Sequence, residues 1–152
     1  HNGRRRQRQM CIRDRKNIVG MKDSTGNLWD NFKSKNFSMF VGSEKLLLDN
    51  LKIGGAGCIS ATTNITGILA KKVFDDFKKT KDSKEIDKLK KIRTIFDETG
   101  NLVSAVHTLK SIENLNFKNL LPPLELLSEE KKNKMLKKLK EFNFINKKNQ
   151  AA

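Results

Sequence analysis

The stretch Asn17-Ile18-Val19-Gly20-Met21-Lys22-Asp23-Ser24-Thr25-Gly26-Asn27 decides how the chain folds. It begins as a short apolar run, which predicts a buried strand over residues 18–21, and it continues as a loop of small and hydroxylated residues. Lys22 comes where this strand ends. We therefore expect its side chain to enter a pocket.

A lysine in a pocket can act as a nucleophile. Burial disfavours the ammonium form, and about 4 kcal/mol of such bias would lower the pKa of a lysine from about 10.4 to roughly 7–8. The neutral amine can then attack a carbonyl carbon and form a Schiff base. The alternative is that Lys22 is simply one of 25 lysines, solvated and without a role.

Two further units of strand, loop and helix follow before residue 80. Residues 37–41 predict a second strand that stops at Gly42, and residues 57–60 predict a third, very short one. A helix is expected after each strand, beginning near Asn27, near Ser43, and at Asn64 or Thr63. The apolar residues expected on these helices are Leu28, Trp29 and Phe32, then Leu46, Leu47, Leu51 and Ile53, then Ile65, Ile68, Leu69, Val73, Phe74 and Phe77. Strands that alternate with helices indicate a parallel sheet and so an α/β fold.

On a parallel sheet, functional residues gather where the strands end. The loops 22–27, 42–45 and 60–64 should therefore open on one common mouth, as they do in a TIM barrel. The alternative is a small doubly wound sheet in which the glycines only form turns. The sequence contains neither GxGxxG nor GxxxxGK[ST], which removes the main support for a dinucleotide or nucleoside triphosphate site.

The first 15 residues differ in composition from the rest of the chain. They contain six of the seven arginines and none of the 25 lysines. Because the string resembles translated sequencing-adapter DNA, we exclude residues 1–15 from the fold as an extraneous or disordered segment. Without them the net charge falls from +15 to +10, since residues 16–152 hold 26 basic and 16 acidic residues. The alternative is a genuine arginine-rich arm that binds nucleic acid through its phosphates.

The rest of the composition favours a protein of the cytoplasm. The lysines are spread along expected helical faces with few aromatic residues between them, which is more typical of a solvated surface than of a nucleic-acid site. Beyond residue 15, Cys58 is the only cysteine, so we expect no disulfide and no metal site. No apolar run approaches 18 residues, and we expect no membrane-spanning segment.

Residues 81–152 are expected to form a helical region. Three apolar stripes at helical spacing predict three helices, the last of which begins near Ser128. Their members are Ile86, Leu89, Ile92, Ile95 and Phe96, then Leu102, Val103, Val106 and Leu109, then Met135, Leu136, Leu139 and Phe142. Packing is sufficient to explain these stripes, and we expect His107 to be structural as well.

Three stretches of the chain together resemble the family of dihydrodipicolinate synthase and N-acetylneuraminate lyase, which are class I, Schiff-base-forming aldolases. The stretches are Gly20-Met21-Lys22-Asp23-Ser24-Thr25-Gly26-Asn27, Val41-Gly42-Ser43-Glu44 and Gly54-Gly55-Ala56-Gly57-Cys58-Ile59-Ser60-Ala61-Thr62-Thr63-Asn64. They follow the family's order and spacing. The resemblance implies the C-terminal part of a TIM (β/α)8 barrel, with about three βα units over residues 16–80 and a C-terminal helical extension over residues 81–152.

The resemblance also implies roles for single residues. Lys22 would condense with the keto group of pyruvate or another 2-keto acid, so that the substrate imine makes a cofactor unnecessary. Ile59 would contribute its backbone carbonyl near the imine. Gly42, Ser43 and Glu44 would line the side where the second substrate binds, and we expect the hydroxyl of Thr25 to hold substrate too.

Within the family, the chain looks closer to the dihydrodipicolinate synthases and the 2-keto-3-deoxy sugar-acid aldolases than to the sialic-acid lyases. The sialic-acid lyases carry an acidic pair where this chain has Glu44-Lys45, and a hydroxyl residue where it has Ala61. These differences leave both of the other two classes open.

The family's proton-shuttling tyrosine has no counterpart, because the chain contains no tyrosine. In the family, that tyrosine and the carboxylate-binding hydroxyl loop come from the first five βα units. We therefore expect this chain to be a fragment without turnover of its own, and the full-length protein to be a homo-oligomer, either a dimer or a tetramer. The alternative is a noncatalytic family member kept for assembly.

Overall fold

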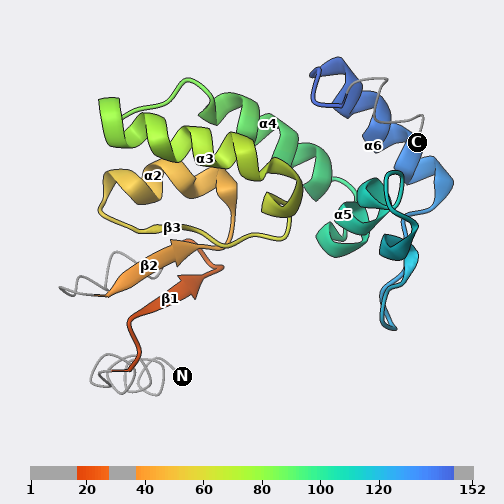
Figure 1. The fold of residues 1–152 in the computed structure, drawn as a ribbon, viewed down its shortest axis with the longest axis horizontal. Helices are drawn as coiled ribbons and strands as arrows, with labels where there is room; N and C mark the ends of the chain where they lie inside the picture. The colour runs from red at the N-terminus through yellow and green to blue at the C-terminus, as the bar shows by residue number, and fades with distance from the viewer. Residues whose placement is uncertain (1–16, 28–36, 146–152) are drawn as a thin grey trace.

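A computed structural model describes residues 17–27 and 37–145. Three short strands form a parallel sheet in the order β1-β2-β3, with β1 at Gly20–Asp23, β2 at Ser38–Val41 and β3 at Gly57–Cys58. The helices α2, α3 and α4 lie together on one side of this sheet, whereas α5 and α6 lie beyond the far end of α4 (Figure 1). The predicted α/β fold with a parallel sheet is confirmed for the described part of the chain.

The first strand runs further along the sequence than predicted. It was expected over residues 18–21 with Lys22 just beyond its end, yet β1 extends through Lys22 to Asp23. The reason is the pairing with β2, in which Lys22 is the register partner of Phe40. The amide of Gly42 then donates to the carbonyl of Asp23 over 2.6 Å and continues the ladder into the loop.

The helices near the sheet begin and end where local signals place them. Ser43 caps a 3-10 turn, η2 at Glu44–Leu46, which continues as α2 at Leu47–Lys52. The chain leaves this helix through Gly54, whose φ of +92° is readily adopted only by glycine. The long helix α3 spans Thr63–Thr80. The helix expected after Asn27, with Leu28, Trp29 and Phe32, lies outside the described residues.

A buried amide ties α2 to the sheet. Asn50 is fully buried, and its Nδ2 donates to the carbonyls of Met39 (3.2 Å) and Gly57 (2.7 Å). These carbonyls belong to the neighbouring strands β2 and β3. The side chain leaves no room beside Gly55, where an added Cβ would lie 1.8 Å from Asn50 Oδ1.

The remaining elements are helical, as the apolar spacing predicted. They are α4 at Ile86–Asp97, α5 at Leu102–Lys110, the 3-10 turn η3 at Leu115–Lys118, and α6 at Glu129–Glu141. Asn101 caps α5 by accepting from the amides of Val103 and Ser104, and Ser128 caps α6 by accepting from the amide of Lys131. All three predicted helices of this region are therefore present.

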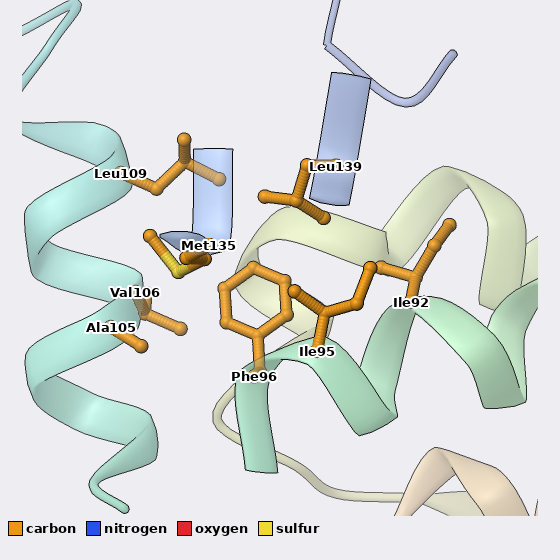
Figure 2. Close-up of a cluster of buried hydrophobic side chains, with 8 residues drawn as sticks. All are labelled: Ile92, Ile95, Phe96, Ala105, Val106, Leu109, Met135 and Leu139. Carbon is orange, nitrogen blue, oxygen red and sulfur yellow. The ribbon is translucent and has the colours of Figure 1, made fainter. Parts of the chain in front are cut away.

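The helix α4 takes part in two hydrophobic clusters. Its Ile86 and Leu89 pack with α2 and α3 near the sheet. Its other apolar residues, Ile92, Ile95 and Phe96, pack with α5 and α6. Figure 2 shows the ring of Phe96 among the side chains that α5 and α6 contribute. Because one helix contributes to both clusters, α4 connects the C-terminal helices to the part of the chain that carries the sheet.

Candidate active site

The structure brings the three predicted loops to one edge of the sheet. Asp23, at the end of β1, is the register partner of Val41, which in turn pairs with Cys58 of β3. The strands are parallel, so Lys22, Gly42 and Ile59 all lie at or just beyond their carboxyl ends. The three loops therefore lie at the same edge of the sheet, as the sequence predicted.

Lys22 passes directly against Gly42. A Cβ atom added at Gly42 would lie 3.1 Å from Lys22 Cε and 2.7 Å from Ser24 Oγ. Glycine at this position thus gives the lysine stem and the loop serine the space they occupy.

The expectation that Lys22 is buried in a pocket is not met in this chain. Its side chain is exposed. The physical reason is its position, because within the described residues β1 is an edge strand with a neighbour on one side only. A wall on the other side of Lys22 would have to come from elsewhere.

The loop that follows Lys22 is shaped by Asp23, which is 2% exposed. One carboxylate oxygen, Oδ1, accepts from the amide of Thr25 (2.7 Å) and from its hydroxyl (2.8 Å). The hydroxyl oxygen of Thr25 in turn accepts from the amide of Asn27 (3.3 Å). The hydroxyl proton of Thr25 thus points to the carboxylate of Asp23 in this chain. Thr25 is nevertheless exposed at this edge of the sheet. Asp23 was not among the residues predicted from the sequence, although an aspartate followed by Ser-Thr-Gly is a typical turn signal.

The loop after β2 presents Ser43 and buries Glu44. Ser43 Oγ accepts from the amide of Lys45 over 3.4 Å, which begins η2. Glu44 is 0% exposed, and its carboxylate faces the protein interior. In this chain its carboxylate therefore cannot meet a ligand in the mouth without a change in the loop.

The carboxylate of Glu44 is held by two helices. Its Oε2 accepts from Nη1 of Arg93 over 2.6 Å, and its Oε1 accepts from the hydroxyls of Thr66 (3.2 Å) and Thr62. Nη1 of Arg93 also donates to Ser60 Oγ over 2.9 Å. Nε of Arg93 donates to Asp97 Oδ1 over 2.8 Å. One arginine on α4 thus contacts the loops that follow β2 and β3.

These contacts set the protonation of the cluster. Burial acts to raise the pKa of Glu44, but hydrogen bonds from Ser60, Thr62 and Arg93 outweigh it and lower that pKa below its ordinary value of 4.5. For Asp97, burial again acts to raise the pKa, and contacts with Lys45 and Arg93 lower it below 3.8. Burial acts to lower the pKa of Arg93, whereas its two carboxylate partners raise it. The cluster is therefore fully charged near neutral pH.

Arg93 was likewise not among the site residues predicted from the sequence. A signal was available, because Arg93 comes four residues after Leu89 and so falls on the apolar face of α4. A charged residue on that face needs a buried partner.

Ile59 follows β3 and is 50% exposed at the mouth. Its amide donates to the carbonyl of Val41 over 2.9 Å, which continues the pairing of β2 and β3 by one residue. No donor from residues 17–27 or 37–145 reaches the Ile59 carbonyl.

The thiol of Cys58 is made unreactive by its surroundings. Burial, together with the charge of Glu44, raises the pKa of Cys58 to about 11, although Arg93 acts in the opposite direction. In a chain that carries Cys11→Ser, we expect Cys58 to react slowly with iodoacetamide near neutral pH and faster as the pH approaches 11. The urea-unfolded chain, where the ordinary value of 9.0 applies, is the control. Rapid alkylation of the folded chain near neutral pH would contradict the assignment.

Other features of the described residues lie away from the mouth. No group of three His, Cys, Asp or Glu residues is placed to hold a metal ion within the described ranges. In the same ranges no helix has the length and apolar character needed to cross a membrane. His107 Nδ1 lies 2.9 Å from the Phe117 carbonyl, a contact between α5 and η3. A groove of about 630 Å³ between α3, α4 and α5 is lined by none of the predicted site residues.

Comparison with known proteins places this arrangement in a family. The family model for the dihydrodipicolinate synthetase family matches residues 10–142. The 4-hydroxy-tetrahydrodipicolinate synthase of Buchnera aphidicola subsp. Cinara cedri is 32% identical over 143 residues, which cover 87% of this chain and 47% of that enzyme. The chain spans about half the length of the curated relatives that it matches over most of its own length.

Two solved structures show the same fold over about half of their chains. Dihydrodipicolinate synthase DapA-2 from Bacillus anthracis matches with a TM-score of 0.71 at 19% identity, covering 87% of this chain and 48% of its own. A prophage protein of the dihydrodipicolinic acid synthase family from E. coli K12, solved in complex with pyruvate, matches with a TM-score of 0.70 at 19% identity, covering 86% of this chain and 48% of its own. With a matching family model over most of its length, the chain belongs to the dihydrodipicolinate synthetase family.

Proposed function

We propose that this chain is part of a lyase or synthase that holds pyruvate, or another 2-keto acid, as a Schiff base on Lys22. The observation that carries the proposal is the position of Lys22 at the carboxyl edge of a parallel sheet, with its Cε against Gly42. The pyruvate complex of the similar prophage protein supports this class of substrate.

The proposed fold is the last three βα units of a TIM barrel, over residues 16–80, followed by a helical extension over residues 81–152. The parallel order β1-β2-β3 and the coverage of about half of each barrel protein support it. Residues 1–15 stay outside the fold in this proposal. Further βα units beside β1 would supply the second wall that Lys22 lacks.

Each residue of the mouth has a proposed part in the chemistry. The amine of Lys22 attacks the keto carbon, water leaves, and a protonated imine remains. The imine withdraws electrons, so the adjacent carbon can lose a proton and leave an enamine that attacks an aldehyde; the reverse sequence cleaves a carbon–carbon bond. The carbonyl of Ile59 lies beside this centre. Gly42 and Ser43 line the side of the second substrate, and Thr25 contacts the substrate through its hydroxyl.

The family resemblance implies that a tyrosine carries out the proton transfers. The chain has no tyrosine. We therefore propose that residues 1–152 contribute the imine-forming half of the site and have no turnover alone. No cofactor is needed, since the imine itself is the electron sink. The proposed setting is a cytoplasmic homo-oligomer formed by the full-length protein.

The test is reductive trapping in the gene product that contains this chain. With pyruvate and borohydride we expect a covalent adduct detectable by intact-protein mass spectrometry, and we expect none in Lys22→Ala. Lys45→Ala is the matched control, because Lys45 lies in a neighbouring loop but pairs with Asp97 over 2.6 Å. Absence of an adduct in the wild-type protein would favour a noncatalytic family member instead.

A further inference from the structure

We propose that Arg93, in the C-terminal helical region, is a positioning residue for the active site and that Glu44 serves the site through it. On this proposal Arg93 holds the loops after β2 and β3 in the arrangement that a ligand on Lys22 requires. The inference rests on the proposed function for the identity of the ligand, but its structural part can be tested without it.

The contacts place Arg93 between the two loops. Its Nη1 lies 2.6 Å from Glu44 Oε2 in the loop after β2, and 2.9 Å from Ser60 Oγ and 3.4 Å from Thr62 Oγ1 in the loop after β3. Its Nε is fixed by Asp97 one turn further along α4. A single planar group thus links both loops to one helix.

The linked residues are neighbours of those that face the mouth. Ser60 directly follows Ile59, whose carbonyl is free of donors from the described residues. Glu44 directly follows Ser43 and stands two residues from Gly42. Displacing Ser60 or Glu44 would therefore displace the backbone that lies beside Lys22.

The cluster is too deeply buried to bind a ligand itself. Glu44 and Thr62 are both 0% exposed, Ser60 is 8% exposed and Arg93 is 7% exposed. A role for Glu44 in the site must therefore be exerted through position. The sequence resemblance implied instead that Glu44, with Gly42 and Ser43, lines the side where the second substrate binds.

The arginine fork is needed for this role. A lysine would carry the same positive charge on a single ammonium group. It cannot contact Glu44, Ser60 and Asp97 at once from one rigid planar group, as the guanidinium of Arg93 does. A buried ion pair often stabilises a protein less than apolar residues of the same volume would, so stability alone does not account for a charge in this place. Fixing one arrangement of two loops does account for it.

The experiment measures the pyruvate concentration that gives half-maximal borohydride trapping, in the gene product that contains this chain. We expect Arg93→Lys and Arg93→Met to raise it on the order of tenfold, because a misplacement of about 1 Å can cost up to about a hundredfold. The matched control is Leu139→Ala, a fully buried residue of α6 in the cluster that α4 forms with α5 and α6. It should lower stability while leaving that concentration within about twofold.

A second readout keeps the two proposals separable. Hydrogen exchange of the amides of residues 43–46 and 59–64 should accelerate in Arg93→Met more than in Leu139→Ala. If the wild-type protein formed no adduct but the exchange difference were present, the proposed function would fail and the positioning role would stand. Equal exchange in the two variants, or an unchanged pyruvate concentration in Arg93→Lys and Arg93→Met, would overturn the positioning role.

Discussion

Glu44→Ala is expected to lower the free energy of unfolding by about 3–5 kcal/mol, as does removal of one partner from other buried ion pairs. The loss arises less from the missing attraction than from the guanidinium of Arg93, which would stay buried without its partner. Urea denaturation followed by circular dichroism measures it, with Cm as the readout and an unchanged m-value as the check on two-state behaviour.

Two controls identify the mechanism. The double variant Glu44→Leu, Arg93→Met should recover much of the loss, because apolar residues of similar volume replace both charges. Glu98→Ala removes an ion pair with Lys138 in which Glu98 is exposed and Lys138 is half-buried, and it should change stability little. If Glu44→Ala lowered the free energy of unfolding as little as Glu98→Ala, the ion pair of Glu44 and Arg93 would not contribute to stability as a buried pair does.

The same pair predicts a pH dependence with a definite sign. The pKa of Glu44 is lowered in the folded chain, so its contribution is fully present above the ordinary value of 4.5 and is lost as the pH falls through the folded value. Asp97 acts in the same direction below 3.8. Unfolding free energies measured across this acidic range should decline more steeply for the wild type than for Glu44→Gln. Parallel curves would contradict the assignment.

Phe96→Ala is expected to cost about 3–5 kcal/mol, the range for truncating a buried aromatic residue. Phe96 is 0% exposed and packs between α4 and the two C-terminal helices (Figure 2). The cavity would weaken the attachment of α5 and α6, so their amides should lose protection from hydrogen exchange before those of α3 do. Thermal unfolding and exchange mass spectrometry measure the two effects.

The matched control for Phe96 is Leu121→Ala. Leu121 is 83% exposed, and its truncation should change stability by less than about 0.5 kcal/mol. A cost for Phe96→Ala as small as that of Leu121→Ala would mean that the cluster does not attach the C-terminal helices.

The described helices, and the placement of three loops at one edge of the sheet, were predictable because their signals are local. The spacing of Ile86, Leu89, Ile92 and Phe96 predicts α4, and Ser128 marks the start of α6. Three short apolar runs, each ending in small or polar residues, were enough to predict a parallel sheet with its loops at one edge. Such patterns can be recognised without knowing which residues far apart in the sequence come into contact.

The end of β1 and the cluster beneath the mouth were not predictable in this way. The continuation of β1 through Lys22 depends on pairing with β2, and the exposure of Lys22 depends on which strands stand beside β1. Glu44 and Arg93 are 49 residues apart, and neither residue type nor spacing says that they meet. Only the position of Arg93 on the apolar face of α4 indicated that it has a buried partner.

The central claim is that one particular lysine among 25 forms the imine. Its most direct test is peptide mapping by mass spectrometry after pyruvate and borohydride treatment of the gene product that contains this chain. We predict that the reduced pyruvate adduct lies on Lys22 and is lost in Lys22→Ala. An adduct on another lysine, or one that persists in Lys22→Ala, would contradict the account.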